Sequence, residues 1–252
     1  MQLILWIVVP CYNEEAVLPQ TLHQLGQLLD NMIDTGLVNS QSQVVCVDDC
    51  STDGTWNIIE QSKCGGLRLN KNCGHQNALM AGMDMALGKA DVVITIDADL
   101  QDDPNVIPRM VELNQQGADV VYGVRNDRSC DTIAKRLSAN AFYRVIRWFN
   151  APVIANHADF RLISQRAIER LTHYDGRRLF LRGIIPQMGF PSAQVSFGRC
   201  QRQAGESKYT LWRMLRLAAD GFSTVFWGRF SDMPKTYHRY QIVQIINISK
   251  SL

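Results

Sequence analysis

Short apolar runs alternate with helical segments along the first half of the chain, and this alternation restricts the fold more than any other feature. The apolar runs cover residues 2–9, 44–47, 66–69, 91–96 and 118–124. Segments with helical spacing lie between them, at 14–29, 52–61, 74–87 and 104–115. Strands that are apolar on both faces and separated by helices form a parallel sheet covered on two sides. The sequence therefore predicts an α/β fold with a mostly parallel, Rossmann-like sheet and helices on both faces.

The composition is that of an ordinary globular domain. Of 252 residues, 46% are hydrophobic and 20% are charged, which excludes a disordered or fibrous chain. The longest apolar run, residues 3–9, is far shorter than the ~20 residues that cross a bilayer. It also lacks the basic flank of a secretory signal. The seven cysteines include no CxxC pair, which favours reduced thiols in a cytosolic compartment.

Charge is divided unevenly between the two halves of the chain. Residues 1–120 contain 5 Lys/Arg against 16 Asp/Glu, whereas residues 121–252 contain 21 against 8. An acidic half can gather a metal ion, and a basic half can gather phosphates or an anionic membrane surface. Scattered surface charge is the alternative interpretation, but the asymmetry is too large to favour it.

The residues just after the apolar runs are the candidates for a binding site, because ligands of such sheets bind beyond the carboxyl ends of the strands. Acidic residues follow the first, second and fourth runs. The residues in question are Pro10, Cys11, Tyr12, Asn13, Glu14 and Glu15; Asp48, Asp49, Cys50 and Ser51; Asp97, Ala98, Asp99, Leu100 and Gln101; and Gly123 and Arg125.

Asp97 and Asp99 form a DxD pattern that suggests a metal site. If the chain is still extended here, both side chains point the same way. Two converging carboxylates repel each other unless a cation lies between them, and hard oxygen ligands favour Mg²⁺ or Mn²⁺. Helix capping is the alternative role for acids in this region, and we assign it to Asp102 or Asp103, which precede a proline.

Several common enzyme classes are excluded by missing motifs. The chain has no GxGxxG after its first strand and no GxxxxGK[ST], which argues against a dinucleotide oxidoreductase or a P-loop NTPase. It has no HExxH or GxSxG, which argues against the common hydrolases. Its five histidines are scattered, and we interpret each as structural.

Together, several motifs resemble the inverting family 2 glycosyltransferases of the GT-A fold. Three of them lie in the first half: Val8-Val9-Pro10-Cys11-Tyr12-Asn13-Glu14-Glu15, Val47-Asp48-Asp49-Cys50-Ser51-Thr52-Asp53-Gly54-Thr55 and Asp97-Ala98-Asp99-Leu100-Gln101-Asp102. Those of the second half resemble the polyprenyl-phosphate subgroup, which includes bactoprenol glucosyltransferases and dolichol-phosphate mannose synthases: Lys135-Arg136, Asp159-Phe160-Arg161-Leu162, Phe180-Leu181-Arg182-Gly183 and Arg202-Gln203-Ala204-Gly205-Glu206-Ser207-Lys208-Tyr209. The similarity extends over roughly residues 4–226.

The resemblance implies a role for each matching residue. The base, ribose and phosphates of a nucleotide-sugar donor would be bound by Pro10, Tyr12, Glu14, Asp48, Asp49 and Arg125. A divalent metal, Mg²⁺ or Mn²⁺, would be held by Asp97, Asp99 and Gln101. The acceptor phosphate would be bound by Lys135, Arg136, Arg202 and Lys208, and the catalytic residues would be Asp159, Asp99 and Arg202. The chain departs from the family pattern at Cys50, where a glycine or another small residue is usual.

Two of these roles have structural alternatives. Asp159 matches a position assigned as a base or as a carboxylate that orients the acceptor, but it could also form a structural pair with Arg161. Arg136 and Arg202 could be members of surface ion pairs. A phosphate monoester has its second pKa near ~6, so a lipid phosphate is already a nucleophile at neutral pH. Orientation would then matter more than a strong general base.

The end of the chain suggests membrane contact without a membrane span. Residues 209–230 have amphipathic helical spacing with tryptophans suited to a headgroup boundary, although packing on the catalytic core is the alternative. Residues 133–149 are a second candidate. The expected domains are a catalytic domain (1–208), the amphipathic helix (209–230) and an atypical tail (231–252) without transmembrane helices. Residues 241–248 are apolar but too short to span a bilayer.

The leading hypothesis is an enzyme that moves a sugar from a UDP- or GDP-sugar to a polyprenyl phosphate with inversion, in cell-envelope glycan or lipid modification. It would act peripherally at the cytoplasmic face of the membrane, without nucleic acid and as a possible homo-oligomer. A saccharide acceptor is one alternative. The other is a non-catalytic remnant that binds nucleotide-sugars.

Overall fold

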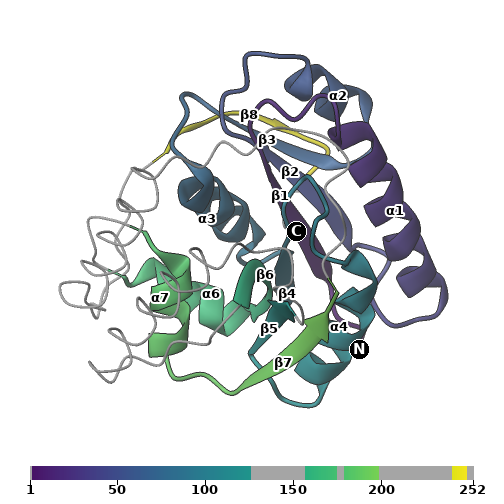
Figure 1. The fold of residues 1–252 in the computed structure, drawn as a ribbon, viewed down its shortest axis with the longest axis vertical. Helices are drawn as coiled ribbons and strands as arrows, with labels where there is room; N and C mark the ends of the chain where they lie inside the picture. Colours follow the sequence, from purple (N-terminus) through teal and green to yellow (C-terminus); the bar gives the residue numbers. More distant parts are fainter. Residues whose placement is uncertain (1, 126–156, 175–178, 199–239, 249–252) are drawn as a thin grey trace, which may run out of the picture.

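The computed structural model describes residues 2–125, 157–174, 179–198 and 240–248 (Figure 1). Its centre is an eight-stranded sheet in the order β7-β5-β6-β4-β1-β2-β3-β8. The strands are β1 (Leu5–Cys11), β2 (Gln43–Asp48), β3 (Gly65–Leu69), β4 (Val92–Thr95), β5 (Val120–Arg125), β6 (His157–Ser164), β7 (Ser192–Phe197) and β8 (Ile242–Ile246). Strands β1 to β5 and β7 share one direction, and β6 and β8 run antiparallel to their neighbours.

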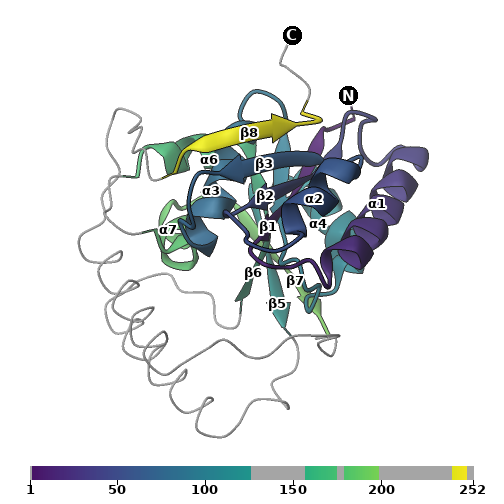
Figure 2. The same ribbon diagram turned by 90° about the horizontal axis from the view of Figure 1, so that it is seen from above.

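Helices cover both faces of the sheet, as Figure 2 shows. Helices α1 (Leu18–Asp34), α2 (Thr55–Gln61) and α4 (Ile107–Gln115) lie on one face, the last preceded by the short 3₁₀ helix η1 (Pro104–Val106). Helices α3 (His75–Ala86), α6 (Gln165–Thr172) and α7 (Leu181–Gln187) lie on the other. Each face has its own cluster of buried apolar side chains, because the strands of a parallel sheet are apolar on both sides. The predicted fold class is confirmed.

The elements predicted in the first half are all present, with shifted ends. The largest shift is at α1, which begins at Leu18 rather than at residue 14. The carbonyl of Glu14 accepts hydrogen bonds from the N–H groups of Val17 and Leu18, so a turn precedes the helix. Helix α2 begins at Thr55, three residues later than expected, with Gly54 at its N-cap position.

Strand β6 brings residues of the second half to the carboxyl edge of the parallel strands. It lies antiparallel between β4 and β5, with Thr95 opposite Arg161 and Val124 opposite His157. Because of this direction, its first residues lie beside the last residues of β4 and β5. Asp159 is therefore placed at the edge where the parallel strands end.

Part of the C-terminal tail belongs to the sheet. Strand β8 pairs antiparallel with β3 at the edge (Figure 2), a pairing that the sequence did not predict. A β-carbon on Gly66 would lie 2.7 Å from Cγ1 of Ile246, so glycine makes room for this strand. None of the helices in the described part of the chain is long and apolar enough to cross a bilayer. The predicted amphipathic helix, 209–230, lies outside the described residues, as does the second candidate segment, 133–149.

Helix α3 packs on β1 closely enough to require glycine. A β-carbon on Gly82 would lie 2.4 Å from Cγ1 of Val8 and 3.2 Å from Cγ2 of Val47. Among the described residues, no atom outside the helix lies within 4 Å of the corresponding position on Gly26, in α1. The close spacing between α3 and the sheet therefore depends on the absence of a side chain at Gly82.

We expect Gly82→Ala and Gly26→Ala to change stability in opposite directions. The first should lower the free energy of unfolding by about 1–3 kcal/mol, the usual cost of overpacking a core. The second should raise it by up to about 1 kcal/mol, because alanine favours the helix and meets no obstacle. Urea unfolding of both variants measures this. Equal effects from the two would show that the α3–β1 contact does not limit the packing.

Candidate active site

The loops after β1 and β2 are locked together by hydrogen bonds. The backbone N–H of Asn13 donates to Oγ of Ser51 at 3.0 Å, and the N–H of Thr52 donates back to Oδ1 of Asn13 at 2.8 Å. The N–H of Gly54 donates to Oε2 of Glu15 at 2.7 Å. Asn13 has a positive φ of 55°, which asparagine tolerates better than most residues. These contacts fix the predicted donor loops relative to each other.

The two neighbouring carboxylates at the end of β2 have different partners. Asp48 is fully buried and pairs with Nε of Arg68 at 3.3 Å, and the Arg68 guanidinium stacks on the ring of Trp56. Asp49 accepts hydrogen bonds from the N–H groups of Cys73 (2.7 Å) and Gly74 (2.8 Å). Burial raises the pKa of Asp49, although these two donors oppose the rise. Asp49 thus fastens the loop that leads into α3.

Cys50 occupies a position suited to glycine. Its φ is 62°, in the left-handed region that a β-carbon makes unfavourable. This explains in physical terms why a small residue is usual here, and it shows that the chain keeps the turn despite the substitution.

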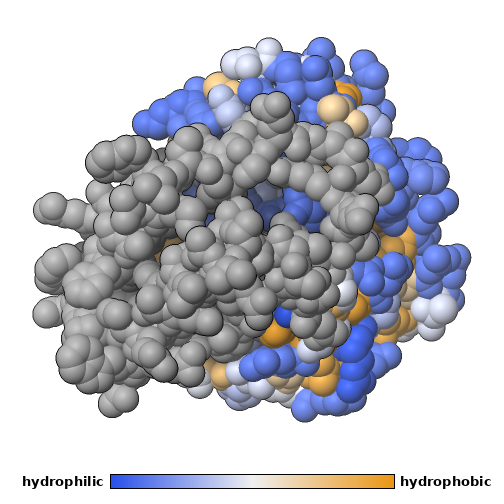
Figure 3. All heavy atoms as spheres, viewed as in Figure 1, coloured by the Kyte–Doolittle hydropathy of each residue, from blue (hydrophilic) through white to orange (hydrophobic). Residues whose placement is uncertain are grey.

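The remaining predicted donor residues of the first half differ in exposure. Pro10 is buried within β1, Glu14 is half-buried, and Tyr12 is 39% exposed. Hydrophilic residues make up most of the visible described surface over α1 and α2 (Figure 3). Of these three residues, Tyr12 therefore presents the most surface to a ligand.

Arg125 is held by a buried carboxylate. Its Nε donates to Oδ1 of Asp102 at 2.7 Å, and Asp102 is 2% exposed. Asp103 is the N-cap residue of η1, where its side chain accepts from the N–H of Asn105. The predicted capping role is therefore confirmed for Asp103, while Asp102 positions Arg125 at the end of β5.

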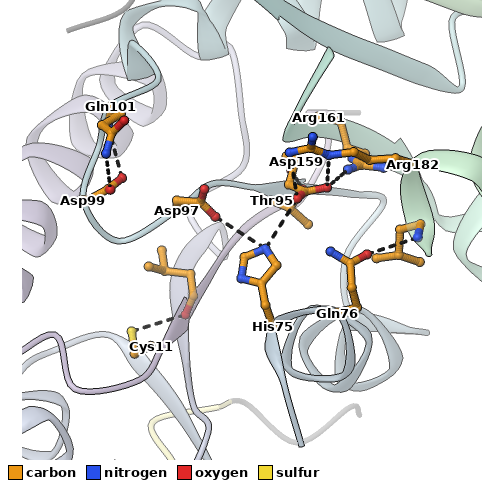
Figure 4. Close-up of polar contacts among 12 residues, drawn as sticks. Cys11, His75, Gln76, Thr95, Asp97, Asp99, Gln101, Asp159, Arg161 and Arg182 are labelled. Carbon is orange, nitrogen blue, oxygen red and sulfur yellow. Dashed lines mark hydrogen bonds and ion pairs between the residues drawn. The ribbon is translucent and has the colours of Figure 1, made fainter. Parts of the chain in front are cut away.

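The acidic segment after β4 is a turn rather than an extended strand. Strand β4 ends at Thr95, and the N–H of Leu100 donates to the carbonyl of Asp97. Asp97 points toward His75, whereas Asp99 accepts a hydrogen bond of 2.6 Å from the side-chain amide of Gln101 (Figure 4). The expectation that an extended backbone aims Asp97 and Asp99 the same way is thus wrong, because alternation does not apply in a turn.

Asp159 lies between cations from two elements (Figure 4). The guanidinium of Arg161, two residues along β6 and 1% exposed, contacts its Oδ1. Arg182, in α7, makes a two-pronged contact, with Nε 3.1 Å from Oδ1 and Nη2 3.1 Å from Oδ2. Burial would raise the pKa of Asp159, but Arg182, Arg161 and His75 outweigh it and hold the pKa well below its ordinary range. The sequence offered an ion pair between Asp159 and Arg161 as one alternative, and the structure contains this pair.

His75 lies between the two acidic groups. Its Nε2 is 3.5 Å from Oδ1 of Asp97 and 3.7 Å from Oδ2 of Asp159. Desolvation raises the pKa of Asp97, and the nearby carboxylates, Asp159 foremost, add to the rise while His75 opposes it. Asp97 and Asp159, from different halves of the chain, thus meet at one point of the sheet edge.

The family profile described as glycosyl transferase family 2 matches residues 6–172, which contain this edge. The chain belongs to glycosyl transferase family 2. The glycosyltransferase YkoT of Bacillus subtilis is 45% identical over 228 residues, which cover 88% of this chain and 68% of that protein. The bactoprenol glucosyl transferase of Shigella phage SfX is 34% identical over 252 residues, which cover 96% and 77%.

Solved structures show the same fold. Glucosyl-3-phosphoglycerate synthase of Mycobacterium tuberculosis, in complex with Mn²⁺, UDP and glucosyl-3-phosphoglycerate, aligns with a TM-score of 0.56 at 20% identity, over 88% of this chain and 78% of that one. The complex of that enzyme with phosphoglyceric acid aligns with a TM-score of 0.59 at 20% identity, over 88% and 79%. The predicted GT-A architecture is confirmed by these similarities.

The structure brings together some of the predicted site residues of this family 2 glycosyl transferase. Asp97 and Asp159 share a partner in His75, while Asp99 and Gln101 contact each other on the same turn. The predicted phosphate-binding residues lie outside the described residues: Lys135, Arg136, Arg202 and Lys208.

Sequence reasoning missed two members of the site. His75 was interpreted as structural, yet it begins the helix that follows the third strand, a position that faces the same sheet edge. Arg182 was noticed only within a motif, and no local pattern shows that it reaches Asp159. The start of a helix directly after a strand was the signal that could have identified His75.

Proposed function

We propose that this protein transfers a sugar from a nucleotide-sugar to a polyprenyl phosphate with inversion at the sugar carbon. The observation that carries the proposal is Asp159, an ionised carboxylate clamped by two arginines at the edge where the parallel strands end. The bactoprenol glucosyl transferases among its relatives support a lipid phosphate as the acceptor. The role would be in cell-envelope glycan or lipid modification.

The donor would bind on the side of β1 and β2. The interlocked loops present Tyr12 to solvent, beside Glu14 and Pro10. Because Asp49 is occupied by two backbone donors, we assign it to holding the loop rather than to the base. Asp48 is fully buried, pairs with Arg68 and accepts the N–H of Ser51, so it would support the donor loops rather than contact the nucleoside. Arg125 would face the phosphates from the end of β5.

The acidic turn fits a divalent cation. Mg²⁺ is usually bound by one or two carboxylates together with substrate phosphates, so either Asp97 or Asp99 would suffice as a protein ligand although the two point apart. Within the described residues, no group of three acidic, histidine or cysteine side chains gathers that could hold a metal without the substrate. Asp97 lies near the carboxylates of Asp159, Asp102 and Asp99, and a cation would relieve the repulsion among them. Gln101 would support Asp99. When bound, Mg²⁺ or Mn²⁺ stabilises negative charge on the leaving diphosphate.

Asp159 is unsuited to the role of a strong general base. A carboxylate held by two guanidinium groups has little affinity for a proton, and its pKa is lowered accordingly. A polyprenyl phosphate does not need such a base, because its oxygen is already ionised at neutral pH. Asp159 and Arg182 would then orient the acceptor for attack on the sugar carbon. The residues assigned to the acceptor phosphate are Lys135, Arg136, Arg202 and Lys208.

A lipid acceptor implies work at a membrane surface. We propose peripheral binding at the cytoplasmic face, through the amphipathic segment 209–230. The partners would be the nucleotide-sugar, the polyprenyl phosphate and the membrane, with a second copy of the chain as a further possible partner and no nucleic acid.

The acceptor is tested by offering labelled UDP- and GDP-sugars with either undecaprenyl phosphate or an oligosaccharide. We expect label in the lipid fraction with at least one donor. Label only in the oligosaccharide would overturn the lipid acceptor while keeping the enzyme. Tight nucleotide binding without turnover on any acceptor would instead identify a non-catalytic binding protein.

The metal role predicts a loss of activity without a loss of fold. Asp97→Asn or Asp99→Asn should remove most of the transfer and weaken donor binding in Mg²⁺ or Mn²⁺, and EDTA should do the same to the wild type. The melting temperature should change little, because removing one of several repelling carboxylates does not unfold a protein. Asp103→Asn, which alters only a cap on the same segment, is the control. Transfer that persists in EDTA would contradict the metal role.

We expect a substitution of Asp159 to lower the stability of the fold, and a substitution of Arg182 to lower turnover with little loss of stability. Asp159→Asn leaves Arg161 buried without its carboxylate, which typically costs about 3–5 kcal/mol. Arg182→Gln keeps the Asp159–Arg161 pair, so it should lower turnover and raise the acceptor KM with a small change in melting temperature. Donor affinity should stay the same in Arg182→Gln. An Arg182→Gln enzyme with wild-type acceptor kinetics would remove this arginine from the acceptor site.

The lowered pKa of Asp159 also fixes the sign of two pH effects. Its ionised form stabilises the folded state at neutral pH, and this contribution disappears as the pH falls below about 4. The stability difference between wild type and Asp159→Asn should therefore shrink in acid. Activity should fall near pH ~6 instead, where the acceptor phosphate takes up a proton. Unfolding curves and transfer rates over the same pH series measure both effects.

A further inference from the structure

The side chain of Gln76, in the first turn of α3, forms a hydrogen bond with the start of α7. We propose that Gln76 is a positioning residue for sugar transfer, because its side-chain carbonyl holds the start of α7 and thereby places Arg182 against Asp159. This inference rests on the proposed function for its kinetic readout. Its structural part, the dependence of α7 on Gln76, can be measured without any substrate.

The contact itself is a well-formed hydrogen bond between distant parts of the chain. The backbone N–H of Leu181 donates to Oε1 of Gln76 at 3.1 Å, across 105 residues of sequence (Figure 4). Leu181 is the first residue of α7 and is 1% exposed, so water has little access to its N–H group. The preceding residue, Phe180, provides no side-chain cap. Gln76 therefore supplies from another helix the acceptor that the first turn of α7 needs.

Helix α7 depends on such outside contacts because it is too short to hold itself. It has seven residues and contains Pro186, and helices of this length are not stable alone. Leu181, Ile184 and Ile185 anchor it by burial in the cluster on the α3 side of the sheet. Apolar burial fixes the depth of the helix but is not directional, whereas the hydrogen bond from Leu181 sets where its first turn begins.

Arg182 immediately follows the residue that Gln76 holds. Its two nitrogens each lie 3.1 Å from an oxygen of Asp159, and a two-pronged contact of this kind tolerates little displacement. A shift at the start of α7 would move the guanidinium away from one or both oxygens. Gln76 thus acts on the acceptor side of the site without touching the reacting atoms.

The residues just before the first turn of α3 are held by Asp49, which follows β2. Asp49 accepts hydrogen bonds from the N–H groups of Cys73 and Gly74, just before His75 and Gln76. One short segment therefore connects the end of β2 with α7. Because Asp49 fixes the segment before Gln76, the side chain of Gln76 has a defined position relative to the sheet. Its hydrogen bond to Leu181 therefore fixes the start of α7 relative to the sheet as well.

Three variants test the role. Gln76→Met keeps the length of the side chain and removes the acceptor. Gln76→Glu keeps an oxygen that can accept the same N–H. Gln187→Ala is the matched control, because the amide of Gln187 donates to the carbonyl of Gly183 within α7 and stabilises the helix locally. For each variant we would measure melting temperature, hydrogen exchange of α7, and kcat and KM for donor and acceptor.

Gln76→Met should lower kcat about tenfold or more, since a misplacement of ~1 Å near the reacting groups can cost about a hundredfold. The donor KM should stay within about twofold, and exchange at the start of α7 should become faster while α6 is unchanged. Gln76→Glu should restore most of kcat. Gln187→Ala should keep kcat within about twofold of the wild-type value, even if its melting temperature falls as much as that of Gln76→Met.

Two results would overturn the proposal: unchanged exchange of α7 in Gln76→Met, or a loss of kcat that is equal in Gln76→Met and Gln187→Ala and follows their melting temperatures. A wild-type protein that transfers to no acceptor would count against the proposed function instead. The exchange measurement would still decide the structural dependence on Gln76.

Discussion

The ion pair between Asp159 and the buried Arg161 ties the chemistry of this site to the interior of the sheet. Breaking such a pair leaves an uncompensated charge in a low dielectric, which costs several kcal/mol, so the two residues must stay together. Arg161 lies opposite Thr95 in the ladder, and the antiparallel direction of β6 carries Asp159 to the edge where β4 ends. The position of Asp159 is therefore as fixed as the hydrogen-bond register of the strands. Its protonation is fixed as well, because two guanidinium groups keep it ionised, and in the proposed reaction this would favour acceptors that bring their own nucleophilic charge.

The donor side is held by a different kind of interaction. The loops after β1 and β2 are joined by hydrogen bonds from backbone N–H groups to side-chain oxygens. Some of these are neutral, as in the reciprocal contacts of Asn13 with Ser51 and Thr52, and one involves the carboxylate of Glu15, which accepts from Gly54. Such bonds define the geometry of the loops, and at Glu15 they also occupy a carboxylate with a backbone donor. Asp49 extends the same principle to α3, where two backbone donors occupy its carboxylate. A carboxylate at a strand end is thus not necessarily a group that binds a ligand. Whether it can bind one depends on the protein groups that already contact it.

The sequence was sufficient to predict the parallel half of the sheet, because hydrophobic periodicity is a local signal and each strand carries its own. It also named Asp97, Asp99 and Asp159 as candidate site residues, and the structure brings Asp97 and Asp159 to the same histidine. It failed where the structure depends on distant pairings: β8 pairs with β3 across most of the chain, and Gln76 meets Leu181 across 105 residues. It failed for a second reason at Asp97 and Asp99, where strand alternation was extended into a segment that is a turn. His75 shows a third limit of the sequence analysis. Its residue type did not indicate a place in the site, and only its position at the start of the helix after β3 did.

The uneven charge of the chain acquires a physical meaning at the sheet edge. Asp97 and Asp99 come from the acidic first half, and Arg161 and Arg182 from the basic second half. Both substrates of the proposed reaction are anions, and anions repel each other unless cations separate or bridge them. In the proposed reaction, a metal on the acidic turn would supply positive charge for the donor diphosphate, while Arg182 would supply it for the acceptor, since Arg161 is buried against Asp159. Asp159 lies between these two regions and, in the proposed reaction, would offset part of the arginine charge, so that the acceptor phosphate would be held less tightly than the metal-bound diphosphate. On this view the ionised Asp159 serves discrimination between two anionic ligands as much as orientation of one of them.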